Sequence, residues 1–201
     1  MTSGDIKELQ FIAPIENLYS IVSDGIMSHE RIGSRPHRSV ADREVQARRE
    51  EKRVPPSQRS LHSYANLYLN ARNPMMFRVA KEMGQDALCI VCVDPAILHG
   101  DGVMIADHNA ATTSCTFYGS PGGLAHIDAR DVFVEWWTTD ESKRKIMAEV
   151  LVPDVVLPRL IMGIRVGSKE AQAAAITALR ESWLRDHVRV DSHMFFPPDP
   201  Q

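Results

Sequence analysis

The segment YANLYLNARNPMMFRVAKEMGQDALCIVCV, residues 64–93, decides the fold class of this 201-residue chain. Residues 64–69 are typical of a strand, and the apolar run 87–93 is typical of a buried strand. Between them, Asn73 and Pro74 predict the N-cap and the first position of a helix that continues to the next glycine. The segment therefore predicts a strand, a helix and a second strand in succession.

Outside this segment the sequence predicts further short strands and three more helices, one of them a polar helix over residues 41–53 that ends before Pro55. Residues 15–24 predict an amphipathic helix, and Ser168 predicts the cap of a helix over residues 169–184. Strands are predicted over residues 9–12, 103–106, 132–137, 148–152, 161–166 and 187–190, before a proline-rich tail. Short strands without regular β–α–β alternation predict an α+β fold, and the length predicts a single domain over residues 1–201.

The composition is that of a folded protein, with 44% hydrophobic and 24% charged residues. The sequence contains no run of 18 apolar residues, so no membrane-spanning helix is predicted. The first 20 residues lack the pattern of a secretory signal. Three cysteines are too few for a disulfide framework and suit a reducing compartment. We therefore expect a cytoplasmic protein with no membrane association.

Several common chemical motifs are absent from the sequence. No GxGxxG or GxxxxGK[ST] follows a strand, and neither HExxH nor GxSxG occurs. Cys89 and Cys92 are three residues apart on a predicted strand, so their thiols point to opposite faces and cannot share a metal. We expect buried structural cysteines and no metal.

Residues 31–59 are basic and poor in large apolar side chains. They carry nine basic and four acidic residues, although the whole chain has a net charge of −3. Such a segment is either a solvated helix face or a site for the phosphates of a dinucleotide or a nucleic acid. About 30 residues with so little to bury are unusual inside a domain and are typical of a functional loop or a disordered segment.

Two further features are candidates for chemistry. The strand-to-helix junction over residues 61–77 carries Tyr68, Arg72 and Met75. An arginine at a helix entrance can bind phosphate, whereas Tyr68 and Met75 at such places more often belong to the core. Glu149 interrupts the apolar strand 148–152, so it lies at an exposed edge, in a cleft, or buried with a partner.

The blocks ENLxxIxxxGI, QARR, LHxYANLYxxARNPM, ADxNA and AEVLVP occur in this order from about residue 11 to residue 166. Together they resemble the DarT family of bacterial toxins, which are ADP-ribosyltransferases that modify bases in DNA. The resemblance implies an ADP-ribosyltransferase-like fold, with a central mixed or antiparallel sheet and flanking helices. It also implies NAD as the substrate that donates ADP-ribose.

The resemblance assigns the catalytic roles to Glu149 and Arg49. Glu149 would stabilise the oxocarbenium-like ribose, hydrogen-bond its 2′-OH and help to activate the attacking base. Arg49 would contact the NAD phosphates and hold the reactive geometry. Residues 32–51, here called the covering segment, would be the helical element over NAD.

The nicotinamide end of NAD would lie against Phe11, Ile12 and Ala13. The family usually has a His-Ile-Thr-like triplet at this place, and this chain lacks the histidine and threonine side chains. Backbone groups could still hold the carboxamide, because an N–H and a C=O match it whatever the side chain. Ser20 and Met27 fall at further NAD-contact positions.

The acceptor would be a base in single-stranded DNA, met by Tyr68, Arg72 and Met75 and by a substrate-recognition region over residues 109–149. Asn109, with His108 beside it, stands where some thymine-modifying relatives have a histidine. The ANLYxxARNPM block is more similar to the guanine-modifying branch, so guanine is favoured and thymine is the other candidate.

The resemblance also implies partners. A toxin of this kind is accompanied by a cognate antitoxin, either a macrodomain or a NADAR-type ADP-ribosyl hydrolase, and the chain is expected to be a monomer. Two alternatives stay open: transfer to RNA or protein, and a catalytically silent nucleic-acid-binding module of the same fold. The lost histidine and threonine support the silent module, whereas the presence of both Arg49 and Glu149 argues against it.

Overall fold

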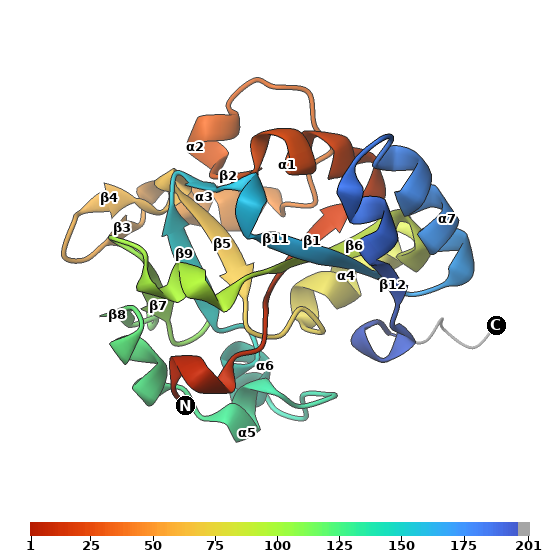
Figure 1. Cartoon of the computed structure of the whole chain (residues 1–201). Coiled ribbons are helices and arrows are strands. Elements are labelled where there is room, and N and C mark those ends of the chain that lie inside the picture. Colours follow the sequence, from red (N-terminus) through yellow and green to blue (C-terminus); the bar gives the residue numbers. More distant parts are fainter. Residues whose placement is uncertain (197–201) are drawn as a thin grey trace.

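An eight-stranded sheet forms the centre of the computed structural model, which describes residues 1–196 apart from the side chain of Arg43 (Figure 1). The strand order is β12-β11-β6-β1-β5-β9-β7-β8. The strands are β1 (Leu9–Pro14), β5 (Tyr64–Tyr68), β6 (Leu88–Val93), β7 (Met104–Ala106), β8 (Phe117–Gly119), β9 (Glu149–Pro153), β11 (Ile161–Val166) and β12 (Val188–Val190). Every neighbouring pair is antiparallel except β11 and β12. The predicted α+β class with a mixed sheet is confirmed.

Seven α-helices and two small two-stranded sheets surround this sheet in the described part of the chain. The helices are α1 (Leu18–Asp24), α2 (His29–Ile32), α3 (Arg43–Glu51), α4 (Pro74–Met83), α5 (Ala129–Val132), α6 (Asp140–Lys145) and α7 (Lys169–Ala178). The small sheets pair β2 (Ile26–Met27) with β10 (Val155–Val156), and β3 (Arg53–Val54) with β4 (Arg59–Ser60). No helix among residues 1–196 is both long enough and apolar enough to cross a membrane.

The two faces of the sheet are covered differently. Alternate residues of β1, β5, β6 and β9 form the larger core with α1 and α7. On the other face, α4 packs on β1 and β6 through Met76 and Val79, together with Phe195 and Phe196 near the end of the described chain. The part of this second face that α4 leaves uncovered is where the candidate site lies.

The elements in the segment that decides the fold form as predicted. The side chain of Asn73 accepts the N–H groups of Met75 and Met76 at 2.9 and 3.2 Å and so caps α4, and Pro74 occupies the first turn. At the other end, Gly84 adopts φ +83°, which L side chains rarely adopt. All three cysteines are free and buried, as expected.

Two predicted elements differ. The strand predicted over residues 132–137 is wrong: α5 ends at Val132 and the chain then runs without a helix or strand to α6. The side-chain amide of Asn70 binds the carbonyls of Val132 and Val134, so this backbone is satisfied without strand pairing. The helix predicted over residues 169–184 stops at Ala178, just before Arg180 turns to φ +51°. The tail beyond residue 196 lies outside the described residues.

Candidate active site

Glu149 begins β9 and lies inside the sheet, because β5 flanks β9 on one side and β7 on the other. Its register partners are Tyr68 on β5 and Ala106 on β7. Residues two apart share a face, so Glu149 points away from the larger core, which receives the side chain of Val150. Glu149 is only 1% exposed, and the alternative of an exposed edge position is therefore excluded.

Two donors hold the Glu149 carboxylate. The Nη1 atom of Arg49 lies 3.2 Å from Oε2, and the two side chains are only 7% and 1% exposed. The backbone N–H of Ala110 donates to Oε1 at 3.1 Å. A buried ion pair needs partners for its remaining polar atoms, and here each carboxylate oxygen has one. The carboxylate is thus fixed in one orientation before a ligand binds.

Arg49 reaches Glu149 from α3, within the covering segment. Asp42 caps this helix by accepting the N–H groups of Glu44 and Val45, and these bonds, Val45 first, hold the pKa of the Asp42 carboxyl below its ordinary value. The helix turns Arg49 inward, while the neighbouring Arg48 stays exposed. α3 therefore brings a charged side chain, rather than an apolar stripe, to the sheet.

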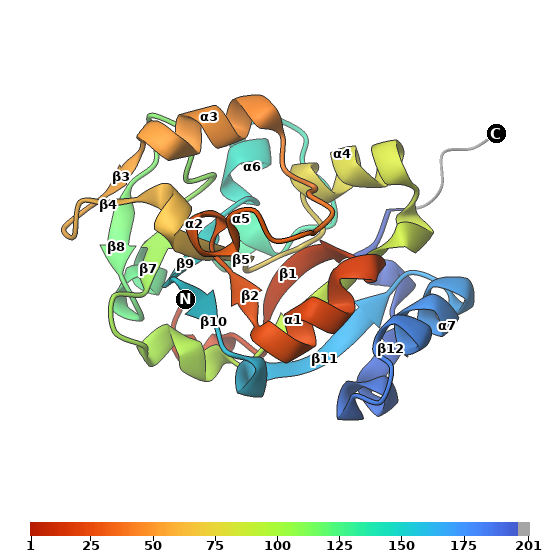
Figure 2. The ribbon, with the colours of Figure 1, turned by 90° about the horizontal axis from the view of Figure 1, so that it is seen from above.

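A cavity of about 650 Å³ lies over the Arg49–Glu149 pair. This volume is in the range of small-molecule and cofactor sites. One wall comes from β1 and α1, the other from α4, α6 and the segment before α6, and the covering segment forms the roof. Figure 2 shows the covering segment (orange) running past α4 and α6, and the Arg78 guanidinium ties it to α4 through the Val40 carbonyl at 2.8 Å.

All the residues predicted to contact NAD lie in the wall of this cavity: Phe11, Ile12, Ala13, Ser20, Met27 and Arg49. The structure thus brings together positions from β1, α1, β2 and α3, although their contacts with NAD stay predictions. Asn17, which the sequence analysis missed, also lines the cavity; its side chain pairs with the backbone N–H and C=O of Arg38 at 3.0 and 2.8 Å. It fastens the covering segment to α1.

The residues predicted to meet DNA separate into two groups. Tyr68, Met75 and Asn109 line the cavity. Burial and the nearby Glu149 charge raise the pKa of Tyr68, so its hydroxyl keeps a proton that it can donate. Arg72 points away from this cavity. Its guanidinium donates to the Phe195 carbonyl at 3.1 Å and lines a separate hollow.

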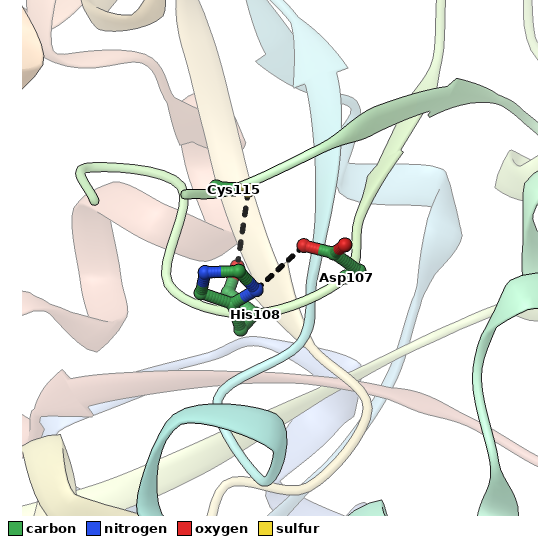
Figure 3. Close-up of side chains that lie close together, drawn as sticks. All are labelled: Asp107, His108 and Cys115. Carbon is green, nitrogen blue, oxygen red and sulfur yellow. Dashed lines mark hydrogen bonds and ion pairs between the residues drawn. The ribbon is translucent and has the colours of Figure 1, made fainter. Parts of the chain in front are cut away.

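His108 also turns away from the cavity, into a cluster with Asp107 and Cys115 (Figure 3). The three donor atoms lie within 4.8 Å of one another, and such donors suit zinc. Each is engaged inside the loop, however: the two His108 ring nitrogens contact Asp107 at 2.6 Å and a serine hydroxyl at 3.0 Å, and Cys115 donates to the His108 carbonyl. Burial raises the pKa of the Cys115 thiol to about 12, so no thiolate forms at neutral pH. The cluster therefore stabilises the loop over residues 107–116, whose Ala110 N–H donates to Glu149. We call it the brace around His108.

Two half-buried polar side chains in the cavity wall each have a buried atom that finds no hydrogen-bond partner among residues 1–196. They are Gln46, through Oε1, and His62, through Nε2. His62 stacks on His29 with ring centroids 4.2 Å apart, and burial, followed by the charges of His29 and Arg49, lowers its pKa. Buried polar atoms of this kind are suited to a polar ligand. The sequence analysis missed both as site residues, although they stand in the blocks QARR and LHxYANLYxxARNPM, because a block does not show which of its side chains lack a partner in the fold.

The chain is similar to known proteins in sequence and in fold. A family model described as "ssDNA thymidine ADP-ribosyltransferase, DarT" matches residues 11–196. A DNA ADP-ribosyl transferase–DNA ADP-ribosyl glycohydrolase fusion protein of Thermosipho africanus is 36% identical over 169 residues, which are 82% of this chain and 43% of that protein. The chain spans about half the length of the Thermosipho proteins that it matches.

Two solved structures are similar in fold. Thermosipho africanus DarTG in complex with ADP-ribose has a TM-score of 0.83 and 32% identity, over 96% of this chain and 52% of that chain. Thermus sp. 2.9 DarT in complex with ADP-ribosylated ssDNA has a TM-score of 0.86 and 23% identity, over 98% and 99%. The predicted ADP-ribosyltransferase-like fold is confirmed, and the chain belongs to the DarT family.

Proposed function

We propose that this protein transfers ADP-ribose from NAD to a base of single-stranded DNA and releases nicotinamide. The observation that carries the proposal is the buried Arg49–Glu149 pair at the wall of a cofactor-sized cavity. The relatives support it, because solved members of the family are complexes with ADP-ribose and with ADP-ribosylated ssDNA.

The reaction breaks the bond between the ribose C1′ and the nicotinamide nitrogen. The bonding electrons leave with nicotinamide, which becomes neutral, and positive charge develops on the ribose. The carboxylate of Glu149 faces that charge and needs no reorientation, since Arg49 and the Ala110 N–H already hold it. A nitrogen of the base then bonds to C1′ and loses its proton, which Glu149 accepts and passes to water.

Arg49 and the covering segment would hold the NAD. The Arg49 guanidinium has further N–H donors besides the one that binds Glu149, and these would bind the phosphates. Phe11, Ile12 and Ala13 would hold the carboxamide through their backbone, with Ser20 and Met27 beside it. Held in this way, the C1′ atom would lie against the carboxylate.

The region over residues 109–149 would select the base, with Tyr68, Met75 and Asn109 in the cavity wall beside it. Guanine is the acceptor that the ANLYxxARNPM block favours, and thymidine is the one that the family description names. The two differ chemically: guanine offers an exocyclic amine, whereas thymine must lose the proton of a ring nitrogen before it attacks.

A role as a toxin accounts for such chemistry, because modified bases block templated copying of DNA. A cognate hydrolase, either a macrodomain or a NADAR-type enzyme, would remove the ADP-ribose. The Thermosipho relative is itself a fusion with a DNA ADP-ribosyl glycohydrolase, which supports a partner of that activity. We propose that the chain works in the cytoplasm as a monomer.

Release of nicotinamide from NAD in the presence of different acceptors tests the proposal. The acceptors are DNA 20-mers in an adenine background that carry one thymine or one guanine, the matching RNA strands, and no nucleic acid. The proposal predicts release that depends on one DNA strand and is lost in Glu149→Gln. Release with RNA alone would support the RNA acceptor, and NAD binding without any release would support the silent module.

A further inference from the structure

Four aromatic rings form a cluster at the α4 side of the cavity. Trp136 and Trp137 stack face to face, with ring centroids 4.7 Å apart and planes 7° from parallel. Phe77 of α4 and Phe196 each contact both indoles edge-on, with ring centroids 5.5–6.0 Å apart. The two phenylalanines also contact each other edge-on, with centroids 5.1 Å apart. We call these four residues the aromatic shelf. Edge-to-face and offset contacts of this kind hold rings in a defined orientation.

The shelf keeps an aromatic surface open to the cavity. Trp136 is 49% exposed although Trp137 covers one of its faces, so the exposed part includes the outward face. Trp136, Trp137 and Phe77 all line the same cavity as Glu149. The shelf is thus a contiguous exposed apolar patch rather than a single exposed side chain, and such patches often mark binding sites.

Contacts from distant residues fix the backbone that carries the shelf. Arg72 donates to the carbonyls of Glu135 and Phe195, and its guanidinium stacks 4.8 Å from the Phe196 ring centroid. Asn70 holds the same segment through the carbonyls of Val132 and Val134. The shelf is therefore organised before any ligand binds, and this explains why Arg72 turns away from the cavity.

Positive charge borders the shelf. Lys143 of α6 is exposed and lines the same cavity as Trp136 and Trp137. Arg78 of α4 lines it too, and its guanidinium pairs with Glu82 at 2.7 Å. A flat aromatic face with cations at its border is the arrangement that proteins use for unpaired bases on a phosphate backbone.

We propose that the aromatic shelf stacks the base that neighbours the acceptor base in the DNA strand, with Lys143 on the adjoining phosphate. The proposal rests on the proposed function. The predicted NAD contacts come from β1, α1, β2 and the covering segment, and none of them is a residue of the shelf, so the shelf is the part of the cavity wall left for the strand. Stacking on Trp136 holds the strand while the acceptor base turns toward Glu149.

The test measures binding of a fluorescein-labelled DNA 12-mer by anisotropy, with wild type, Trp136→Ala, Trp136→Phe and Trp183→Ala. Trp183 is the matched control, because it is 59% exposed and packs edge-on against His187 outside this cavity. Each protein is also titrated with a second strand that has an abasic site next to the acceptor. Base stacking of about 1–3 kcal/mol predicts that Trp136→Ala weakens binding about 5- to 150-fold, with partial recovery in Trp136→Phe.

The abasic strand makes the test specific. If the shelf holds the neighbouring base, the abasic site weakens wild-type binding by a similar factor and weakens Trp136→Ala little further, since both changes remove one contact. Lys143→Ala should reduce the slope of log Kd against log salt by about 0.7, as expected for one phosphate contact on a single strand.

Three results would overturn the proposal. Trp136→Ala could bind DNA as tightly as Trp183→Ala. The losses of binding free energy from Trp136→Ala and from the abasic site could also add in full. Alternatively, Trp136→Ala could weaken binding of NAD measured without DNA and leave DNA binding intact, which would place the adenine of NAD on the shelf. A wild-type protein that neither binds nor modifies single-stranded DNA would instead contradict the proposed function itself.

Discussion

Replacing Arg49 should destabilise the protein more than replacing Glu149, although the two residues form one ion pair. In Arg49→Met, the Glu149 carboxylate keeps only the Ala110 N–H, and its short side chain, which starts from an inner strand, cannot carry the charge out of the buried site. An unpaired buried charge of this kind costs about 3–5 kcal/mol. In a chain of this length, about 2–4 °C per kcal/mol converts that cost to a fall in Tm of roughly 6–20 °C.

The variant at the other end of the ion pair, Glu149→Gln, leaves the Arg49 guanidinium without its carboxylate. In Glu149→Gln, the amide oxygen can still accept from Ala110, and the Arg49 guanidinium lines an open cavity into which it can turn. The expected cost is that of one hydrogen bond to a charged group, about 1.5–3 kcal/mol. Urea unfolding followed by circular dichroism measures both values, and Arg48→Met, exposed on the same helix, is the control. Equal costs, or a larger one for Glu149→Gln, would refute the reasoning, because they would mean that α3 holds its arginine rigidly.

Three further predictions concern stability. Gly25→Ala should lower the free energy of unfolding by at least about 2 kcal/mol, because a Cβ there would lie 2.3 Å from the Val156 carbonyl oxygen, at a φ of +91°. Gly84→Ala is the comparison, because Gly84 has φ +83° but open space around it. Its smaller loss, from backbone strain alone, is measured in the same urea titration. Asn73→Ala should cost about 1–2 kcal/mol through loss of the α4 cap, measured as a lower urea midpoint at unchanged slope. Burial is the main cause that lowers the pKa of His62 below 6.5, so the folded chain binds this proton less readily than the unfolded chain. The protein should therefore lose stability as the pH falls below about 6.5. In melting curves recorded at a series of pH values, His62→Gln should show a smaller fall in Tm over this range than the wild type.

Elements with local signals could be predicted from the sequence. The start and end of α4 depend on Asn73, Pro74 and Gly84, which act within one turn of the helix. The strand β6 could be predicted equally well, because it is a continuous apolar run. The segment at 132–137 was not, since its carbonyls bind the side chain of Asn70, more than 60 residues away in sequence.

The candidate site shows the same division. The resemblance placed Arg49 and Glu149 together, but periodicity could not show that β9 is an inner strand, because its neighbours are set by pairing with distant segments. Arg72 and His108 stand in the blocks that carry the resemblance, yet their directions depend on Phe195 and on Asp107. The brace around His108 and the aromatic shelf are tertiary features without a motif.

The most direct test of the central claim is intact mass spectrometry of single-stranded oligonucleotides after incubation with NAD and the protein. The account predicts one added ADP-ribose unit on DNA, located on one kind of base by fragmentation and absent with Glu149→Gln. It also predicts that Arg48→Met, which leaves the buried pair intact, gives the same adduct as the wild type. An unmodified strand with folded wild-type protein and bound NAD, or an adduct that persists in Glu149→Gln, would contradict the account.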